Sequence, residues 1–444
     1  MNKRAFLKRC ASFAPVPFVQ QLPLLAQTGR LQNWAGNLTY STNTISYPKT
    51  VAEAAAAIAQ HEKLKILGTR HCFNTIADSR HRFISLQEIK TMELNETAKT
   101  VRVGAGIRYG DLAPFLDGKG FALHNLASLP HISVAGAVGT ATHGSGMAQG
   151  NLSTAVTALE FITASGEIVR LQKSDGDAFK TAVVHLGAIG AVSHAELEVQ
   201  PRFDMRQFVF EHLPLAALTQ HFREIMSAGY SVSLFTDWQQ ESINEVWVKE
   251  RCDGAGTVGK ETTFFGAKAA TRNMHPIAAL PAENCTAQMG VCGTWYERMP
   301  HFKMGFTPSS GKELQSEYFV PLEQAVPAIL AIQRLGRQTG PHLFISEIRS
   351  IAADDLWMSP CYQRPSITIH FTWKQEWEAV RKLLPLIEKT LAPFHPRPHW
   401  GKLFTLPKET LAAEYPQLPA FRELVNRYDP RGKFRNDFLQ QHLF

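Results

Sequence analysis

The chain has 444 residues, of which 44% are hydrophobic and 19% are charged, and its net charge is +7. This length predicts two domains, and this composition is that of a globular enzyme, which excludes a disordered chain and an integral membrane protein. The basic residues are scattered, with no run of five, which argues against a nucleic-acid partner.

Residues 1–32 contain a basic segment, Lys3–Arg9, followed by an apolar stretch that ends at Ala26. This order resembles a twin-arginine export signal in which Lys3 replaces the first arginine. Three prolines and two glutamines interrupt the apolar stretch, so a cytoplasmic location is the alternative to export into the periplasm. No window of the chain reaches the roughly 18 apolar residues of a membrane-spanning helix.

Short strands and helices alternate from residue 33 to residue 203, which predicts an α+β domain. Thr50 and Glu53 have the spacing of a capping box at a helix start. The other expected elements, in chain order, are a strand at 64–67, strands at 83–86 and 100–103, a helix at 109–119, a hairpin of strands at 155–163 and 167–171, a helix at 177–186 and a strand at 191–199.

Two segments of this domain suit a phosphate-bearing cofactor. The first, Gly68–Asn74, is a glycine turn after a strand, with His71 at its tip, where backbone N–H groups can face an anion. The second, Ala127–Gly146, is rich in Gly, Ala, Ser and Thr, which lets the backbone approach a large ligand closely. Neither segment has the GxGxxG fingerprint of a dinucleotide-binding fold. The stretch Gly104–Gly106 lacks the third glycine of that fingerprint, so a nicotinamide site is not expected.

Residues 204–389 contain strand candidates at 205–210, 246–251 and 344–349, separated by proline-containing loops, which predicts a second domain built on an antiparallel sheet with flanking helices. In the stretch 365–373, strict alternation places Thr368, His370 and Thr372 on one face, and Glu347 and Arg349 also share a face. Adjacent strands of this kind would offer the hydrogen-bonding surface that a polyol requires. The alternative is an ordinary solvated sheet face.

The cysteines and histidines do not predict a metal site. The six cysteines show no CxxC pair and no zinc spacing, so most are expected to be buried or inert thiols. The pair His395 and His399 has helical spacing, but the prolines between them exclude a helix.

From about Asn33 onward the chain resembles the vanillyl-alcohol-oxidase superfamily of FAD-linked oxidases, within the aldonolactone-oxidase branch and nearest to the alditol oxidases. The two segments above and the tail at 429–438 carry the resemblance. It implies a two-domain α+β flavoprotein whose segment 390–444 returns to the FAD-binding domain, and FAD joined covalently to His71. Many relatives have Gly where this chain has Arg70 and Ser where it has Cys72, which puts a positive-φ turn at Arg70 in question.

The resemblance also implies roles for individual residues. Those expected to contact FAD are Gly68, Thr69, Arg70, His71, Cys72, Ser128, Ser133, Gly136, Thr140, Ala141, Thr142, His143 and Val192. Those expected to bind substrate are Ser128, Glu347, Arg349, His370, Thr372 and Lys402, and of these Arg349, Lys402 and Glu347 are expected to be catalytic.

The expected reaction is oxidation of the terminal alcohol of an acyclic polyol to the aldose, with O2 reduced to hydrogen peroxide. Alternatives are an aldonolactone oxidase or dehydrogenase of the same fold, and a polyol- or sugar-binding flavoprotein without catalysis. The expected partners are the small-molecule polyol and O2, with no nucleic acid, and a monomer is favoured.

Overall fold

Four β-sheets organise the described residues, which are 29–252, 262–305 and 312–444 of the computed structural model. The predicted export segment lies largely outside these residues. Residues 31–444 group into one unit by their contacts, and the domain limits at residues 203 and 389 stay predictions within it.

The first sheet consists of short parallel strands. They lie in the order β1, β3, β2, with bounds Ile45–Ser46, Phe83–Ile84 and Lys65–Ile66. Parallel neighbours need a crossover connection, and the helix α1 (Val51–Gln60) lies between β1 and β2 in the chain. Its first turn is capped by Thr50, whose Oγ1 accepts a hydrogen bond from the Glu53 amide at 3.1 Å. The Glu53 carboxylate bonds to the Lys49 amide, so only half of the predicted capping box is formed.

The second sheet is antiparallel and has the order β4-β5-β9-β7-β8. Its strands are β4 (Met92–Asn95), β5 (Thr100–Gly104), β9 (Ala191–Glu198), β7 (Val156–Ile162) and β8 (Ile168–Gln172). The helices of this region are α2 (Tyr109–Asp117), α3 (Val134–Val138) and α4 (Asp177–Val183), and β6 (Phe121–Ala122) pairs with β10 (Gln200–Pro201). The helix predicted at 177–186 ends at Val183, because Val184 leaves the helical conformation with φ −89° and ψ 71°. Leu186 and Gly187 then turn the chain with positive φ values of 53° and 66°.

The third and largest sheet has ten strands, with the order β14-β15-β11-β13-β12-β18-β19-β17-β20 and β16 paired to β11. Its strands are β11 (Asp204–Pro214), β12 (Ser231–Thr236), β13 (Ser242–Arg251), β14 (Thr263–Phe264), β15 (Ala267–Ala269), β16 (Gly293–Thr294), β17 (Glu313–Pro321), β18 (Leu343–Ile351), β19 (Ser366–Lys374) and β20 (Arg397–Pro398). The expected antiparallel sheet with flanking helices is confirmed.

The two faces of this sheet differ in chemistry, as the alternation in residues 365–373 predicts. Ile367, Ile369, Phe371 and Trp373 of β19 are all fully buried in an apolar core. Helices pack on this face: α5 (Leu215–Met226), α6 (Ala325–Gln333), α7 (Gly336–Thr339) and α8 (Trp377–Leu391). The opposite face carries the polar side chains.

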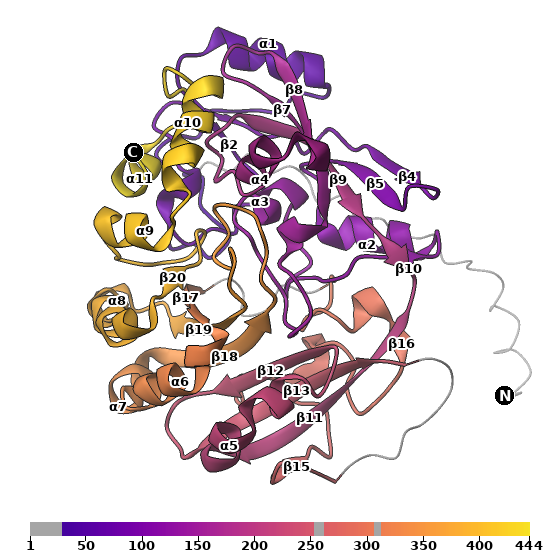
Figure 1. The fold of residues 1–444 in the computed structure, drawn as a ribbon, viewed down its shortest axis with the longest axis vertical. Helices are drawn as coiled ribbons and strands as arrows, with labels where there is room; N and C mark the ends of the chain where they lie inside the picture. Colours follow the sequence, from indigo (N-terminus) through magenta and orange to yellow (C-terminus); the bar gives the residue numbers. More distant parts are fainter. Residues whose placement is uncertain (1–28, 253–261, 306–311) are drawn as a thin grey trace, which may run out of the picture. The chain divides into compact units, whose positions relative to one another are not determined.

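The C-terminal helices lie beside the N-terminal part of the chain (Figure 1). They are α9 (Lys408–Glu414), α10 (Leu418–Tyr428) and α11 (Asp437–His442). The carbonyl of Lys433 accepts a hydrogen bond from the Leu64 amide, and the carbonyl of Tyr428 accepts one from the Ala164 amide, both at 3.1 Å. The strand that leads to the His71 turn is therefore supported by the end of the chain.

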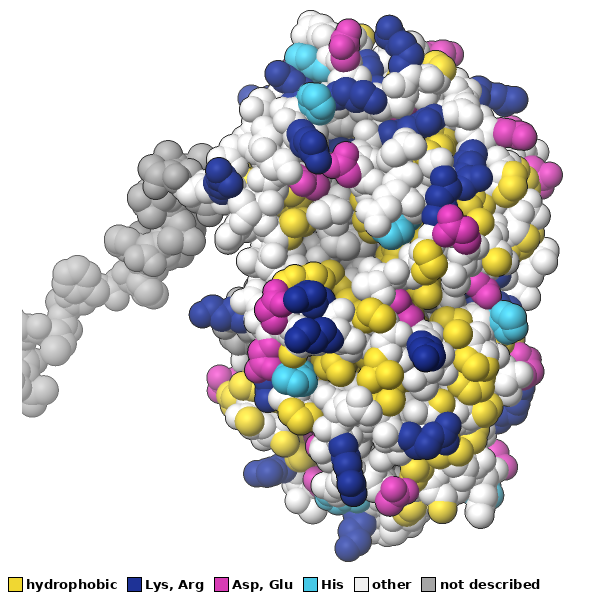
Figure 2. All heavy atoms as spheres, turned by 90° about the vertical axis from the view of Figure 1, so that its left-hand side faces the viewer, with side chains coloured by type: hydrophobic (Ala, Val, Ile, Leu, Met, Phe, Trp, Pro, Cys, Tyr) yellow, Lys and Arg dark blue, Asp and Glu magenta, His cyan; other side chains and the backbone are white. Residues whose placement is uncertain are grey.

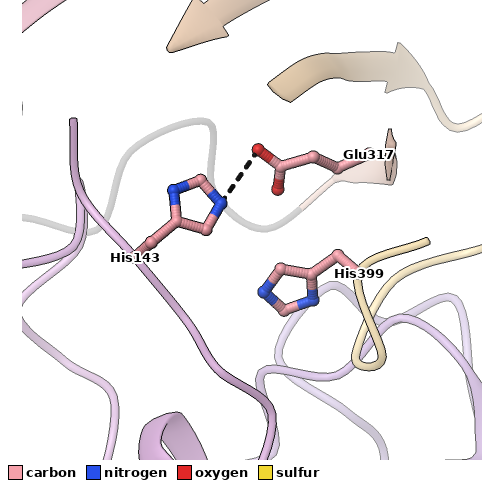
Figure 3. Close-up of side chains that lie close together, drawn as sticks. All are labelled: His143, Glu317 and His399. Atoms are coloured by element: carbon pink, nitrogen blue, oxygen red, sulfur yellow. Dashed lines mark ion pairs between the residues drawn. The ribbon is translucent and has the colours of Figure 1, made fainter. Parts of the chain in front are cut away.

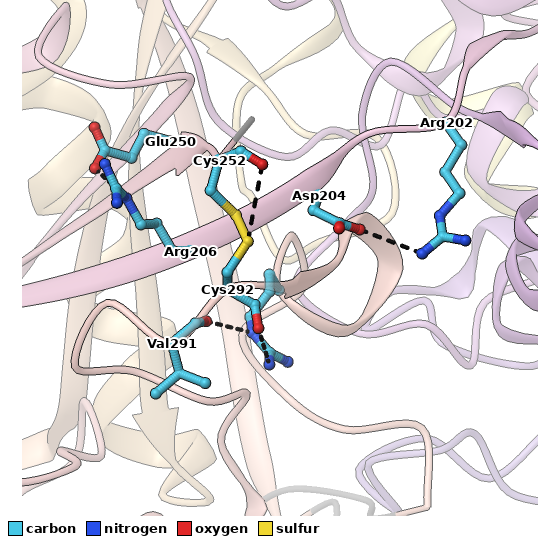
Figure 4. Close-up of a disulfide and its surroundings, with 8 residues drawn as sticks. Arg202, Asp204, Arg206, Glu250, Cys252, Val291 and Cys292 are labelled. Carbon is cyan, nitrogen blue, oxygen red and sulfur yellow. Dashed lines mark hydrogen bonds and ion pairs between the residues drawn. A yellow bond between two sulfur atoms is a disulfide. The ribbon is translucent and has the colours of Figure 1, made fainter. Parts of the chain in front are cut away.

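Two of the cysteines are not thiols. Cys252, at the end of β13, forms a disulfide with Cys292 across a sequence separation of 40 (Figure 4). The sequence expectation is thus wrong for this pair, because a bridge between distant segments leaves no local spacing signal. Cys285 and Cys361 are buried free thiols, and Cys72 is half-buried.

The surface carries both signs of charge. On the face in Figure 2, lysine and arginine side chains are interspersed with aspartate and glutamate. Among the described residues, no helix has the length and apolar character required to cross a membrane.

Candidate active site

One cavity is lined by residues from both the N-terminal and the C-terminal half of the chain. The predicted cofactor residues that line it are Gly68, Thr69, Arg70, His71, Cys72, Ser128, Ser133, Gly136, Thr140, Thr142, His143 and Val192. The predicted substrate residues that line it are Ser128, Glu347, Arg349, His370, Thr372 and Lys402. Ala141 is not in the lining. It is fully buried with a φ of +51°, and its expected contact with FAD stays a prediction.

His71 lies in the turn after β2 with its ring exposed to this cavity. The ring stacks on Trp34, with 5.2 Å between centroids, and neither ring nitrogen has a hydrogen-bond partner among the described residues. Burial, with a smaller effect of His131, lowers the pKa of His71 to about 4, so the ring is neutral near pH 7. Buried nitrogens without partners are rare in proteins, and a neutral imidazole keeps a free lone pair. This is the state that an attachment point for a ligand requires.

Arg70 takes the left-handed backbone conformation that usually favours glycine. Its φ is +64°, which costs an L-residue about 1–2 kcal/mol. Two bonds hold it: the Arg70 carbonyl accepts from the Trp34 amide at 2.8 Å, and Nη1 donates to the carbonyl of Gln32 at 3.1 Å. The positive-φ turn questioned in the sequence is therefore present with arginine in place.

The N-terminal part of the cavity fits FAD. A Cβ on Gly68 would lie 2.7 Å from the Ser133 hydroxyl, so the backbone here runs closer to its neighbour than any side chain would allow. Lys65 and His185 also line the cavity, and neither has an acidic side chain within ion-pair distance among the described residues. Burial lowers the pKa of His185 to about 4, so it is neutral, and Lys65 Nζ donates to the carbonyls of Gly187 and Phe434. Burial lowers the pKa of Lys65 to about 7. Buried basic groups without an acid partner suit an anionic ligand such as a diphosphate.

The C-terminal part of the cavity is the polar face of the ten-stranded sheet. Strand register aligns Phe235, Glu347, His370 and Glu317 in one row across β12, β18, β19 and β17. The predicted neighbours Glu347 and His370 are therefore directly opposite each other, and Arg349 extends from the next row on the same face. All of these polar residues are less than 9% exposed, so their charges must be met by one another or by a ligand.

Glu317 is the centre of this charge arrangement, although its strand was not among the predicted ones. Arg349 Nη2 donates to its Oε1 at 2.7 Å, and Lys402 Nζ donates to its Oε2 at 2.6 Å. Burial alone would raise the pKa of Glu317, but Lys402 and Arg349 outweigh burial and hold it well below the usual value. Glu347 is 3.5 Å from Arg349 Nε, so Arg349 is shared between two carboxylates and not held by Glu347 alone.

Lys402 makes two hydrogen bonds in the site. Besides the bond to Glu317, its Nζ donates to His370 Nδ1 at 2.8 Å, and the other ring nitrogen of His370 lies 3.0 Å from Thr372 Oγ1. Burial lowers the pKa of Lys402, and Glu317 only partly opposes this effect. Burial also lowers the pKa of His370 to about 4. The histidine is thus neutral near pH 7, and burial favours the neutral form of Lys402 more than water would.

The loop that bears Lys402 is tied to the loop that bears His71. The Asn74 side-chain amide donates to the carbonyls of Trp400 and Lys402 at 2.8 and 2.7 Å. The Phe73 amide donates to the carbonyl of Gly401 at 2.8 Å. The Phe73-Asn74 end of the glycine-turn segment therefore sets the position of Lys402 relative to His71.

Three side chains in the site have the spacing of a metal-ligand set. They are His143, Glu317 and His399, whose possible ligand atoms lie within 4.8 Å of one another (Figure 3). His143 Nε2 lies 3.2 Å from Glu317 Oε1, whereas His399 Nδ1 accepts a hydrogen bond from the Gly401 amide. The carboxylate of Glu317 already has Arg349 and Lys402 as cationic partners. A metal ion would have to compete with both cations for this carboxylate. We therefore assign His143, Glu317 and His399 to the polar lining of the cavity and not to a metal site.

Some site residues were missed by sequence reasoning. They are Lys65, Lys249, His301, Gln315, Glu317 and His399. A signal existed for part of this set, because Glu313, Gln315 and Glu317 alternate with Leu314 and Ser316 in the same way as residues 367–373. No sequence signal pointed to His301 and Lys249. They lie on a loop and a strand that are far apart in sequence and come together only in the fold.

Two family models match the chain. Residues 43–172 match the model described as FAD binding domain, and residues 306–442 match the model described as D-arabinono-1,4-lactone oxidase. The first range contains His71 and the glycine-rich segment, and the second contains Glu317, Arg349 and Lys402.

Whole-chain relatives extend this result. An alditol oxidase from Streptomyces is 44% identical over 416 residues, which cover 93% of this chain and 98% of that protein. An L-gulono-1,4-lactone dehydrogenase from Mycobacterium tuberculosis is 26% identical over 93% of this chain and 98% of its own length. A crystal structure of cholesterol oxidase from B. sterolicum superposes with a TM-score of 0.76 at 14% identity, covering 93% of this chain and 96% of that one, which shows a shared fold.

Proposed function

The chain belongs to the alditol oxidase family, and we propose that it uses FAD to oxidise the terminal primary alcohol of an acyclic polyol, of the xylitol or sorbitol type, to the aldose. The observation that carries this proposal is the shared cavity, in which Arg349, Lys402 and Glu347 line the same space as His71. We also propose that FAD is joined covalently to His71, which is supported by the neutral ring and its two nitrogens without partners.

FAD held by the residues around His71 would supply the hydride acceptor, with the electrons passing to O2 to give hydrogen peroxide. Loss of hydride from the terminal carbon requires its hydroxyl to lose a proton, so negative charge develops on that oxygen. Arg349 suits stabilisation of this charge, because guanidinium does not deprotonate and is fixed by Glu317 and Glu347 before substrate binds. Its Nε makes the long 3.5 Å ion-pair contact to Glu347 Oε2 but no hydrogen bond among the described residues, so this N–H can also donate to a substrate oxygen.

Lys402 suits the role of proton acceptor. A neutral amine keeps two N–H bonds, and two acceptors, Glu317 Oε2 and His370 Nδ1, are in place for them. Its lone pair is then left for the proton of the reacting hydroxyl. Burial lowers the pKa of Lys402 and so favours this neutral form.

The remaining hydroxyls of an acyclic polyol need partners when they leave water. Glu347 can accept a hydrogen bond from the hydroxyl next to the reacting carbon. Ser128, His370 and Thr372 also line the cavity and can meet hydroxyls further along the chain. Ser128 is linked to this set, since its Oγ lies 3.5 Å from Arg349 Nη1.

The test is hydrogen peroxide release during aerobic incubation with a panel of alditols and aldonolactones. We expect peroxide with alditols and a much lower rate with lactones. Release with lactones alone would favour the lactone oxidase alternative, in line with the C-terminal family match. No release with either class, together with bound polyol, would favour a binding protein, although two cationic side chains in contact with a neutral ligand argue against one.

We further propose that the protein is exported. The Cys252–Cys292 disulfide supports this, because disulfides persist in oxidising compartments and are rare in the cytosol. Replacing Lys3 and Arg4 together by Gln should leave activity in the cytoplasmic fraction, whereas protein purified from the native host with Met1 still present would contradict export. We favour a monomer, which gel filtration tests.

A further inference from the structure

A second buried chain of polar groups begins at Glu347 and His301, which both line the cavity, and ends at Lys249, which does not. It runs from Glu347 on β18 to His301 in the loop before residue 306, and from there to Lys249 on β13. His301 Nε2 lies 2.7 Å from Glu347 Oε1, and Lys249 Nζ lies 3.2 Å from His301 Nδ1. All of these side chains are nearly inaccessible, at 5% for Glu347, 5% for His301 and 1% for Lys249. The mechanism above does not use His301 or Lys249.

The direction of the hydrogen bonds follows from Lys249. Its Nζ also donates to the carbonyls of Met299 and Pro300 at 2.6 and 3.0 Å. Burial lowers the pKa of Lys249 to about 7, so its charged form is populated at and below about pH 7. That form has three N–H bonds for three acceptors, so His301 Nδ1 accepts the third. The proton of the neutral ring is then on Nε2, and this nitrogen donates to Glu347.

The ring of His301 is also held in place sterically. Phe235, Trp247 and Phe302 meet it edge-on, with centroids 5.4, 5.2 and 6.4 Å away. Burial and the Lys249 charge lower the pKa of His301 to about 4. Burial alone would raise the pKa of Glu347, but Arg349, and after it His301, hold it below the usual value. A fixed neutral ring with its proton on Nε2 adds to the effect of Arg349 by donating to Oε1.

We propose that Lys249 and His301 are positioning residues that restrict Glu347 to accepting hydrogen bonds, so that the enzyme selects alcohols with a second hydroxyl beside the reacting carbon. This inference rests on the proposed polyol oxidation. A substrate hydroxyl can donate to Glu347 Oε2, which lies 3.5 Å from Arg349 Nε, whereas an analogue without that hydroxyl leaves this buried oxygen with the long ion-pair contact and no hydrogen bond from substrate. A site built to bond a hydroxyl rejects the analogue that lacks it.

The test compares an alditol with its 2-deoxy analogue in the FAD-loaded enzyme, by the ratio of their kcat/KM values. In Lys249→Met and His301→Leu we expect this ratio to fall about tenfold or more, the value of one charge-assisted hydrogen bond. His301→Gln should retain most of the ratio, since the Gln amide can donate from the position of Nε2. If Lys249 and His301 had a purely structural role, the variants would lower kcat/KM for both substrates equally and leave the ratio unchanged. That result would overturn the proposal.

Lys433→Met is the matched control. Lys433 is also a buried lysine, and its Nζ donates to the carbonyls of Ile58 and Ala164 at 2.6 Å each. Its loss should affect stability as the Lys249 change does, but leave the substrate ratio at the wild-type value. A drop in the ratio with Lys433→Met would mean that the ratio follows stability, which would also overturn the proposal.

A measurement on the wild-type protein does not depend on the folding of any Lys249 variant. Histidine-ring ¹⁵N NMR, with His301 assigned by the signal that His301→Gln removes, should show a neutral ring with its proton on Nε2. A proton on Nδ1, or a charged ring near pH 7, would refute the inference. Wild-type enzyme that oxidises neither substrate would instead contradict the proposed function and leave the NMR result to decide the inference.

Discussion

The carboxylate of Glu317 lies 2.6 Å from the Lys402 amine nitrogen and, through its other oxygen, 2.7 Å from the guanidinium of Arg349. One buried acid therefore holds both basic residues of the site at the same cavity wall. This relation makes Glu317 as important to the site as the residues that meet substrate.

Glu317→Gln tests this relation, because it keeps the shape of the side chain and removes its charge. Breaking a buried ion pair leaves uncompensated charge, which costs about 3 kcal/mol or more. We expect a loss of that size in the free energy of unfolding, measured with denaturant, and at least a tenfold slower anaerobic flavin reduction. Glu378→Gln, on the exposed face of α8 beside Arg381, is the control and should change neither. Unchanged stability in Glu317→Gln would contradict a central role for this carboxylate.

The pH dependence of flavin reduction should report Lys402. A base acts in its deprotonated form, so the rate should rise with pH through the pKa of Lys402, which burial places below the usual 10.5. His370, with its pKa near 4, is already neutral in this range and adds no step. Stopped-flow reduction from about pH 6 to pH 10 measures the profile. Lys402→Met should abolish the rise, and a flat wild-type profile would rule out Lys402 as the base.

His71→Ala tests the flavin attachment. Acid-precipitated wild-type protein should stay yellow, because a covalent bond survives unfolding. The variant should release its flavin on precipitation or purify without it. Absorbance of the pellet and of the supernatant measures both. If the wild-type supernatant contained the flavin, attachment at His71 would be wrong.

The Cys252–Cys292 bridge should contribute to stability through the loop that it closes. For a separation of 40 residues the expected contribution is about 2–4 kcal/mol. Replacing both cysteines by Ser should lower the free energy of unfolding by this amount, and adding a reductant should destabilise wild type but not the double variant. Equal stability of the two proteins in oxidising buffer would mean that the bridge does not form.

Much of the architecture follows from local sequence signals. The alternation in residues 365–373 predicts both faces of β19, and Gly68–Asn74 marks the His71 turn, because these signals depend only on backbone periodicity and turn chemistry. The bounds of the elements are predicted less well than their presence. An example is the helix predicted at 177–186, which ends at Val183. The next residue is Val184, whose φ and ψ of −89° and 71° are not helical, and no glycine or proline in the sequence marks this position.

The site was predictable only in part. Glu347, Arg349 and Lys402 were assigned through resemblance, whereas nothing local in the sequence states that Glu317 joins two of them. Its role arises from the pairing of β17 with β19, a long-range contact. The same holds for Cys252 with Cys292 and for Lys249 with His301, since each pair is distant in sequence and adjacent only after folding.

The most direct test of the central claim is anaerobic stopped-flow reduction of the bound flavin by an alditol. Loss of one preorganised charged group costs roughly 2–4 kcal/mol in the transition state. Arg349→Ala and Lys402→Ala should therefore each slow reduction by about a hundredfold or more, and the surface control Arg381→Ala should not. Near-normal reduction in both the Arg349 and the Lys402 variants would contradict the account and place the chemistry elsewhere in the molecule.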